Sequence, residues 1–99
     1  MPMRVEATCE FRDWIDALKD LAGRARIQVR IDRLLHGNAG QLQRLGDGVS
    51  ELKIDSGPGY RVYYTIRGTR LLLLLVGGDK SSQRRDIAKA IRLAKEFQE

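Results

Sequence analysis

Apolar residues recur at helical spacing in three parts of the chain, which predicts three amphipathic helices. Gly23 indicates a break or a tight corner between the first two helices, and Gly37 is expected to cap the end of the second. Ser81 or Ser82 is the expected N-cap of the last helix. The three apolar stripes are Phe11, Trp14, Ile15 and Leu18; Ile27, Ile31, Leu34 and Leu35; and Ile87, Ile91, Ala94 and Phe97.

Elsewhere the pattern has the period of two that is typical of strands. Residues 3–8 predict a short first strand, and apolar and polar side chains alternate from Val49 to Ile54 and again from Tyr60 to Arg67. Leu71 to Val76 is apolar without interruption, which indicates a central strand that is buried on both faces.

The stretch between the second helix and the alternating strands, residues 38–48, is rich in glycine and predicts an irregular connection with one helical turn at Gln41–Leu45. No repeat or linker divides the 99 residues, so we expect a single domain, 1–99. The elements follow in the order strand, helix, helix, three antiparallel strands, helix. That order predicts an α+β fold in which the helices pack on one small sheet.

The balance of charged residues indicates which kind of molecule the protein binds. Lys and Arg number 18 against 13 Asp and Glu, and this net charge of +5 favours an acidic partner such as nucleic acid. The single cysteine, Cys9, suits a reducing compartment and is expected to be a buried structural thiol. One Cys and one His, His36, cannot supply a metal site of the usual spacing, and no cofactor is expected. Because neither a signal peptide nor a membrane-length apolar run is present, we expect a cytoplasmic protein with no membrane partner.

The strand alternation places Lys53, Arg61, Tyr63 and Arg67 on the face opposite the predicted core. Cations with an aromatic ring between them suit RNA, because cations bind phosphate and a ring stacks on a splayed base. The solvent face of an antiparallel sheet carries the same residue types, and the pattern alone favours that interpretation.

Two further sets of residues are candidates for binding an anion. The glycine-rich string at residues 77–82 precedes a helix and would hold a phosphate on free backbone N–H groups, although an ordinary strand-to-helix turn is more frequent. Basic lines on the helices are more often solvated faces than binding sites. They comprise Arg26, Arg30 and Arg33, and Arg85, Lys89 and Arg92.

No Ser-His-Asp triad, Cys-His pair or catalytic carboxylate pair can be assembled from the sequence. An enzyme of this composition therefore suits a substrate that brings its own nucleophile, as RNA does with its 2′-hydroxyl group.

Two strings of residues resemble a known family: Gly57-Pro58-Gly59-Tyr60-Arg61-Val62-Tyr63-Tyr64 and Gly77-Gly78-Asp79-Lys80-Ser81-Ser82-Gln83. With Val49–Ile54 and the Phe11–Leu18 helix, they are similar to the addiction-module killer proteins of the RelE/HigB toxin superfamily over nearly the whole chain. The resemblance implies an antiparallel sheet flanked by helices. It also implies the toxin of a type II toxin–antitoxin system, an endoribonuclease that cuts mRNA in the ribosomal A site without metal. The implied partners are the ribosome, mRNA and a cognate antitoxin, expected to be a small helix-turn-helix protein.

The resemblance also implies roles for single residues. Arg61 matches the strand arginine that contacts the scissile phosphate, Lys53 matches a basic residue on the neighbouring strand, and Lys80 matches the basic position after the last strand. The family's C-terminal tyrosine is missing here, where the chain reads Asp86-Ile87-Ala88, so Lys53 and Tyr63 are the candidates for proton transfer. The residues expected to contact RNA are Arg26, Arg30, Arg33, Arg67, Ser81, Gln83 and Arg85.

The missing tyrosine favours one alternative. On the same scaffold, a module without catalysis would bind RNA or the ribosome, or would act as a co-repressor with its antitoxin.

Overall fold

The computed structural model describes residues 3–97, which form one five-stranded sheet, three α-helices and one 3-10 turn. The elements are β1 (Arg4–Ala7), α1 (Cys9–Ala17), α2 (Leu21–Leu35), β2 (Leu42–Gly46), β3 (Val49–Ile54), β4 (Tyr60–Arg67), β5 (Leu71–Gly78), η1 (Lys80–Ser82) and α3 (Gln83–Glu96). The sheet order is β1-β5-β4-β3-β2, with β1 parallel to β5 and the other neighbours antiparallel. The predicted α+β fold is confirmed.

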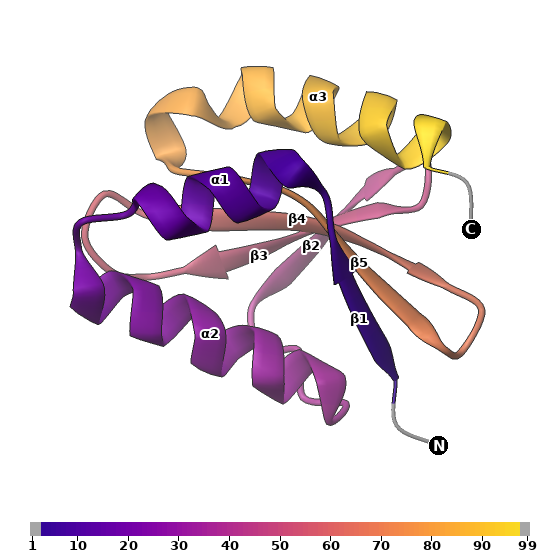
Figure 1. Cartoon of the computed structure of the whole chain (residues 1–99), viewed down its shortest axis with the longest axis horizontal. Coiled ribbons are helices and arrows are strands. Elements are labelled where there is room, and N and C mark those ends of the chain that lie inside the picture. The colour runs from indigo at the N-terminus through magenta and orange to yellow at the C-terminus, as the bar shows by residue number, and fades with distance from the viewer. Residues whose placement is uncertain (1–2, 98–99) are drawn as a thin grey trace.

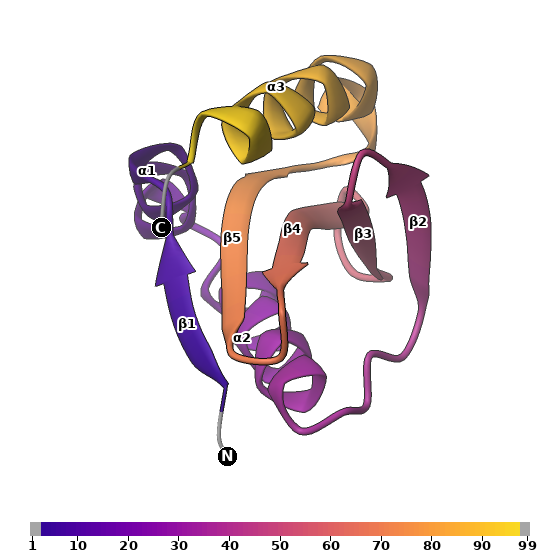
Figure 2. The same cartoon turned by 90° about the vertical axis from the view of Figure 1, so that its right-hand side faces the viewer.

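The sheet separates two helical layers, as Figures 1 and 2 show. On one face, α1 and α2 cover a core that includes Ile27, Leu52, Val62 and Leu72. On the other face, α3 covers a second core built around the fully buried Tyr63. The small residues Ala90 and Ala94 face this second core and allow α3 to approach the sheet closely. The face that was expected to carry open cations is therefore largely covered by a helix.

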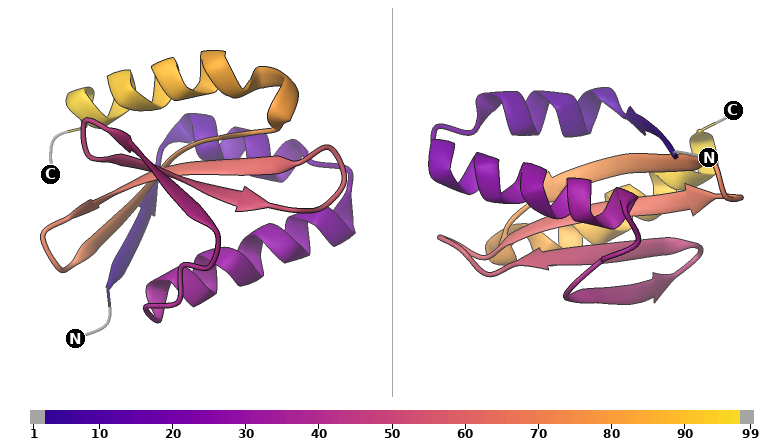
Figure 3. Two further views of the ribbon diagram at one scale, coloured as in Figure 1. Left: turned by 180° about the vertical axis from the view of Figure 1, so that it is seen from behind. Right: turned by 90° about the horizontal axis from the view of Figure 1, so that it is seen from below.

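The prediction of a helical turn at Gln41–Leu45 is wrong. Leu42–Gly46 forms β2, an edge strand that pairs with β3, with Leu42 opposite Leu52. Most of its side chains are exposed, so the alternation that burial imposes on a strand is absent from this part of the sequence. Asp47 and Gly48, with φ values of 54° and 76°, make the tight turn into β3. The sheet thus has four antiparallel strands rather than three. Figure 3 shows the sheet from two further sides.

Gly23 lies inside α2 rather than between two helices. The helix begins at Leu21, and the side chain of Asp20 caps it by accepting the Gly23 N–H at 3.0 Å. A Cβ atom on Gly23 would lie 2.6 Å from the Tyr60 ring. The glycine is needed because the first turn of α2 packs directly on that ring.

Of two N-terminal positions, one differs from expectation and the other agrees with it. Cys9, the first residue of α1, is exposed rather than buried. Trp14 lies in the core as expected but is only partly buried, and it packs on Gly77, where a Cβ atom would meet its ring at 2.0 Å. Among residues 3–97, no helix is long and apolar enough to span a membrane.

Candidate functional site

Three basic residues gather where β3 ends, β4 begins and β5 ends. We call Lys53, Arg61 and Lys80 the basic corner. Lys53 lies directly opposite Arg61, and Arg61 lies opposite Gly78, two residues before Lys80 opens η1. Residues directly opposite in an antiparallel pair have Cβ atoms about 5 Å apart, and like charges placed there destabilise the pair. Pairing within the sheet therefore gives no stabilising reason for placing these cations together.

Gly59 brings two of these cations together. Its φ of 79° lies in the region that glycine adopts without strain. A Cβ atom at this position would lie 3.2 Å from Arg61 Nη1 and 3.6 Å from the Lys80 Cβ. Arg61 and Lys80 thus share the turn between β3 and β4, which explains physically why a glycine occupies this part of the Gly-Pro-Gly string.

The guanidinium group of Arg61 is held in a fixed orientation. The residue is 5% exposed. Its Nη1 donates to the carbonyl oxygen of Gly59 at 2.7 Å and, less closely, to that of Tyr60 at 3.4 Å. Its Nε is buried without a hydrogen bond, 3.8 Å from Glu51 Oε2. No hydrogen bond within residues 3–97 occupies Nη2, so this is the nitrogen that an incoming anion can use.

A buried carboxylate lies behind the basic corner. Glu51 is 3% exposed, and its Oε1 accepts a hydrogen bond from Gln83 Nε2 at 2.8 Å. Tyr63 lies opposite Glu51 and is fully buried. Burial, followed by the charge of Glu51, raises the pKa of Tyr63 well above its ordinary value. The expectation that Tyr63 stacks on a base or transfers a proton is therefore wrong, because a substrate cannot reach its ring or its hydroxyl group.

The expected phosphate cradle at residues 77–82 is filled by the protein's own carboxylate. Asp79 Oδ1 accepts the backbone N–H of Ser81 at 2.8 Å and the Ser81 hydroxyl group at 2.5 Å. Chiefly this hydroxyl bond holds the pKa of Asp79 below its usual value. Ser82 takes the N-cap position of α3 but makes no side-chain cap; its hydroxyl group donates to Asp86 Oδ2 at 2.5 Å instead. Lys80 and Ser81 remain exposed beside this turn.

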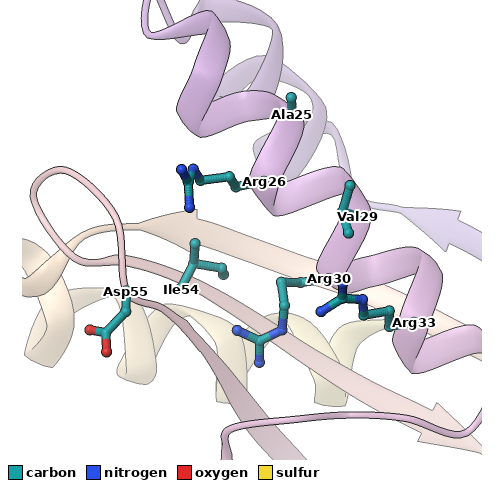
Figure 4. Close-up of a pocket in the computed structure, with 7 residues that line it drawn as sticks. All are labelled: Ala25, Arg26, Val29, Arg30, Arg33, Ile54 and Asp55. Atoms are coloured by element: carbon teal, nitrogen blue, oxygen red, sulfur yellow. The ribbon is translucent and has the colours of Figure 1, made fainter.

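A groove of about 390 Å³ lies between α2 and the end of β3 (Figure 4). Arg26, Arg30 and Arg33 line it together with Val29 and Ile54. Arg30 is committed to the fold, because it donates to the carbonyl oxygens of Lys53, Ala39 and Gln41 at 2.7, 3.1 and 3.0 Å. Arg26 and Arg33 make no such hydrogen bonds within the described chain, so they are the cations that the groove can offer to a ligand.

The other candidate cations lie apart from the basic corner. Arg67 is at the far end of β4, where it donates to the carbonyl oxygens of Ala94 and Phe97 at the end of α3, with its guanidinium 5.7 Å from the Phe97 ring centroid. Arg85 is exposed on α3 and lines a hollow of about 470 Å³ beside η1. Arg67 thus stabilises α3, whereas Arg85 is available near Lys80.

Residues 13–99 match the family described as Phage derived protein Gp49-like (DUF891). The chain belongs to this family. A similar protein from Haemophilus influenzae, described as uncharacterized, is 45% identical over 97 residues and covers 98% of each chain. A solved structure of E. coli toxin RelE, an arginine-to-alanine double mutant in the free state, matches with a TM-score of 0.75. It covers 94% of this chain and 98% of RelE at 15% identity, which shows that this Gp49-like protein has a RelE-like fold.

Sequence reasoning missed the buried carboxylates of this Gp49-like chain. Glu51 and Asp86 are both buried, at 3% and 6% exposure, although each lies in a segment read as having a polar outer face. The sequence contains one indication of such a group: two glycines end the buried strand β5, and a glycine in a strand often marks a place where another group approaches the backbone closely. A Cβ atom on Gly78 would lie 1.9 Å from Asp86 Oδ2, so the glycine leaves room for the Asp86 carboxylate to pack against the strand.

Proposed function

We propose that this protein is the toxin of a toxin–antitoxin pair and that it cleaves mRNA on the ribosome without a metal ion. The observation that carries the proposal is the basic corner. There the Arg61 guanidinium group is held in one orientation beside Lys53 and Lys80, and its Nη2 makes no hydrogen bond within residues 3–97. The RelE-like fold and the sequence resemblance to the RelE/HigB toxins support it. It acts in the cytoplasm, where its substrate is found.

The chemistry follows from the charge that builds up on a phosphate under attack. The 2′-oxygen of the RNA forms a bond to phosphorus, the bond to the 5′-oxygen breaks, and the 2′-proton leaves as the 5′-oxygen gains one. In the proposal, Arg61 Nη2 and the Lys80 ammonium bind the phosphate oxygens and stabilise the developing negative charge. Lys53 assists the proton transfer or the charge stabilisation from the opposite strand. Holding the phosphate in line supplies the rest of the acceleration.

Arg26 and Arg33 extend the proposed RNA path away from the basic corner. The groove that they line is also lined by Ile54 and Asp55, the two residues that follow Lys53 in the chain. Arginines bind phosphate in two-pronged geometry, and exposed apolar atoms of Val29 offer contact to a base. Ser81 and Arg85 lie near Lys80 and extend the proposed RNA path at the other end of the basic corner. Gln83 contributes indirectly, because its side-chain amide donates a hydrogen bond to Glu51.

The partners in this proposal are a cognate antitoxin, for which we expect a small helix-turn-helix protein, and the ribosome carrying its mRNA. A net charge of +5 suits association with ribosomal RNA, since release of counterions from phosphate drives such binding.

A second candidate is a module on the same scaffold that binds RNA or the ribosome without cutting, or that acts as a co-repressor. One observation favours it: within residues 3–97, the basic corner includes no histidine and no reachable tyrosine to transfer a proton. This module would arrest growth or repress transcription without generating RNA ends.

Controlled expression of the wild-type chain in bacteria tests the proposal. We expect growth and translation of a reporter to stop, and co-expression of the proposed cognate antitoxin to restore both. Arg61→Lys, which keeps a positive charge beside buried Glu51, is expected to remove the inhibition because an ammonium group lacks the planar donor set of a guanidinium. Unimpaired growth with folded wild-type protein present in the cells would overturn the proposal.

A further inference from the structure

We infer that Glu51 is a positioning residue that fixes the orientation of the Arg61 guanidinium group in the proposed cleavage site. The inference rests on the proposed function and adds a residue to it. Glu51 lies on β3, two residues before Lys53 and on the same face of the sheet.

The two oxygens of the Glu51 carboxylate face different partners. Oε1 accepts the Gln83 amide at 2.8 Å, and Oε2 lies 3.8 Å from Arg61 Nε. Gln83 is the first residue of α3, and Lys80 lies in the turn that leads into it. One carboxylate therefore links the arginine on β4 to the segment that carries the other phosphate-binding cation.

Burial shows that this carboxylate is not an ordinary surface charge. The side chains of Glu51 and Arg61 are 4% and 6% exposed, and the Glu51 side chain sits beside the fully buried Tyr63. Removing a carboxylate from water is costly, and well-packed apolar residues often stabilise a fold at least as well as a buried ion pair. A glutamate here therefore indicates a role that an apolar residue in the same space would not fill.

That role follows from the geometry of the guanidinium group. Nη1 is bound to the carbonyl oxygen of Gly59, and Nε faces the Glu51 carboxylate, which leaves Nη2 as the free donor. The negative charge also offsets the repulsion between Lys53 and Arg61, which lie directly opposite each other. Without Glu51, only the hydrogen bonds from Nη1 orient the guanidinium plane, and the direction of Nη2 is less well fixed.

Cleavage kinetics on purified ribosomes programmed with a short mRNA provide the test, with the full-length protein in each case. Glu51→Gln keeps the shape of the side chain and removes the charge. We expect kcat to fall by about 10- to 100-fold with a smaller change in KM, since misorientation of a catalytic group has effects of that order. Glu6→Gln is the matched control: it removes a strand carboxylate that pairs with Arg4 on the surface, and wild-type kinetics are expected.

A double-mutant cycle separates positioning from a purely structural role. If Glu51 acts through Arg61, then Arg61→Lys lowers kcat strongly in the wild-type background but only slightly in the Glu51→Gln background. The exchange of the two side chains, Glu51→Gln with Gln83→Glu, restores a carboxylate–amide hydrogen bond but places the charge on α3. We expect the exchange to recover thermal stability without recovering kcat.

The outcomes distinguish the two proposals. Wild-type kcat in folded Glu51→Gln, or additive effects in the cycle, would overturn the positioning role while leaving the proposed function intact. If the wild type itself does not cleave ribosome-bound mRNA, the proposed function fails first; if Arg61→Lys cleaves at the wild-type rate, the role of Arg61 fails and the positioning role of Glu51 fails with it. Recovery of kcat in the exchanged variant would reduce Glu51 to a structural residue.

Discussion

Arg30 and Arg33 lie one turn apart on α2 and line the same groove, yet we expect their removal to have opposite consequences. Arg30 makes three hydrogen bonds to backbone carbonyl oxygens, which tie α2 to β3 and to the segment that leads into β2. Arg33 is exposed, and its side chain makes no hydrogen bond within residues 3–97. Both substitutions by alanine remove one positive charge from the same surface, so each serves as the control for the other.

The magnitude follows from the Arg30 contacts. A hydrogen bond contributes about 1 kcal/mol net, and somewhat more when the donor is charged, so three bonds of which one is exposed are worth about 2–4 kcal/mol. A domain of this size loses roughly 4–8 °C in Tm for each kcal/mol, so Arg30→Ala should lower Tm by about 8–30 °C. Arg33→Ala should change the free energy of unfolding by less than about 0.5 kcal/mol, as surface substitutions usually do.

Urea unfolding followed by the fluorescence of Trp14 measures both variants. Trp14 is the only tryptophan and packs against Phe11 and Tyr60, with ring centroids 5.8 and 6.1 Å away, so its emission reports loss of the core. In an RNA-binding assay with the folded proteins, Arg33→Ala should reduce the salt dependence of the affinity by about one phosphate contact. Equal urea midpoints for the two variants would refute the assignment of Arg30 to the fold.

Three further predictions concern stability. Gly78→Ala should destabilise the protein by at least about 1–3 kcal/mol in urea unfolding, because the new Cβ atom would collide with the Asp86 carboxylate. The pKa of Asp20 is lowered, first by the backbone N–H that it accepts at the start of α2 and then by the Tyr60 hydroxyl group. The stability that the ionised form contributes is therefore present above the ordinary carboxyl pKa and is lost as pH falls through the lowered value; Asp20→Asn should flatten the acid side of a plot of urea midpoint against pH. Arg67→Ala should lower Tm by releasing the end of α3, while RNA cleavage per folded molecule remains at the wild-type level, and a selective loss of cleavage would contradict its structural role.

Most of the fold could be predicted because burial leaves a period in the sequence. The uninterrupted apolar run of β5 and the alternation of β4 identified the two central strands, since their side chains are buried on at least one face. The edge strand β2 was missed because its backbone pairs while most of its side chains stay exposed. Strand pairing alone does not select a residue pattern.

The candidate site was only partly accessible to sequence reasoning, because local patterns do not say what covers a face. The alternation correctly grouped Lys53, Arg61 and Tyr63 on one side of the sheet. The same alternation could not reveal that α3 covers that side of the sheet and buries Tyr63. Nor could it reveal that Glu51, under the same helix, accepts a hydrogen bond from Gln83. Those facts depend on contacts between segments that are far apart in the sequence, such as the Glu51–Gln83 hydrogen bond with a separation of 32.

The most direct test of the account is primer extension on a translated reporter mRNA after induction of the wild type, Arg61→Ala and Arg70→Ala. Arg70 is an exposed arginine in the turn at the opposite end of β4, so its substitution matches the charge change away from the basic corner. We expect new 5′ ends at in-frame codon positions with the wild type and Arg70→Ala, and none with folded Arg61→Ala. Growth arrest by the wild type without new 5′ ends, or equal cleavage by Arg61→Ala, would contradict it.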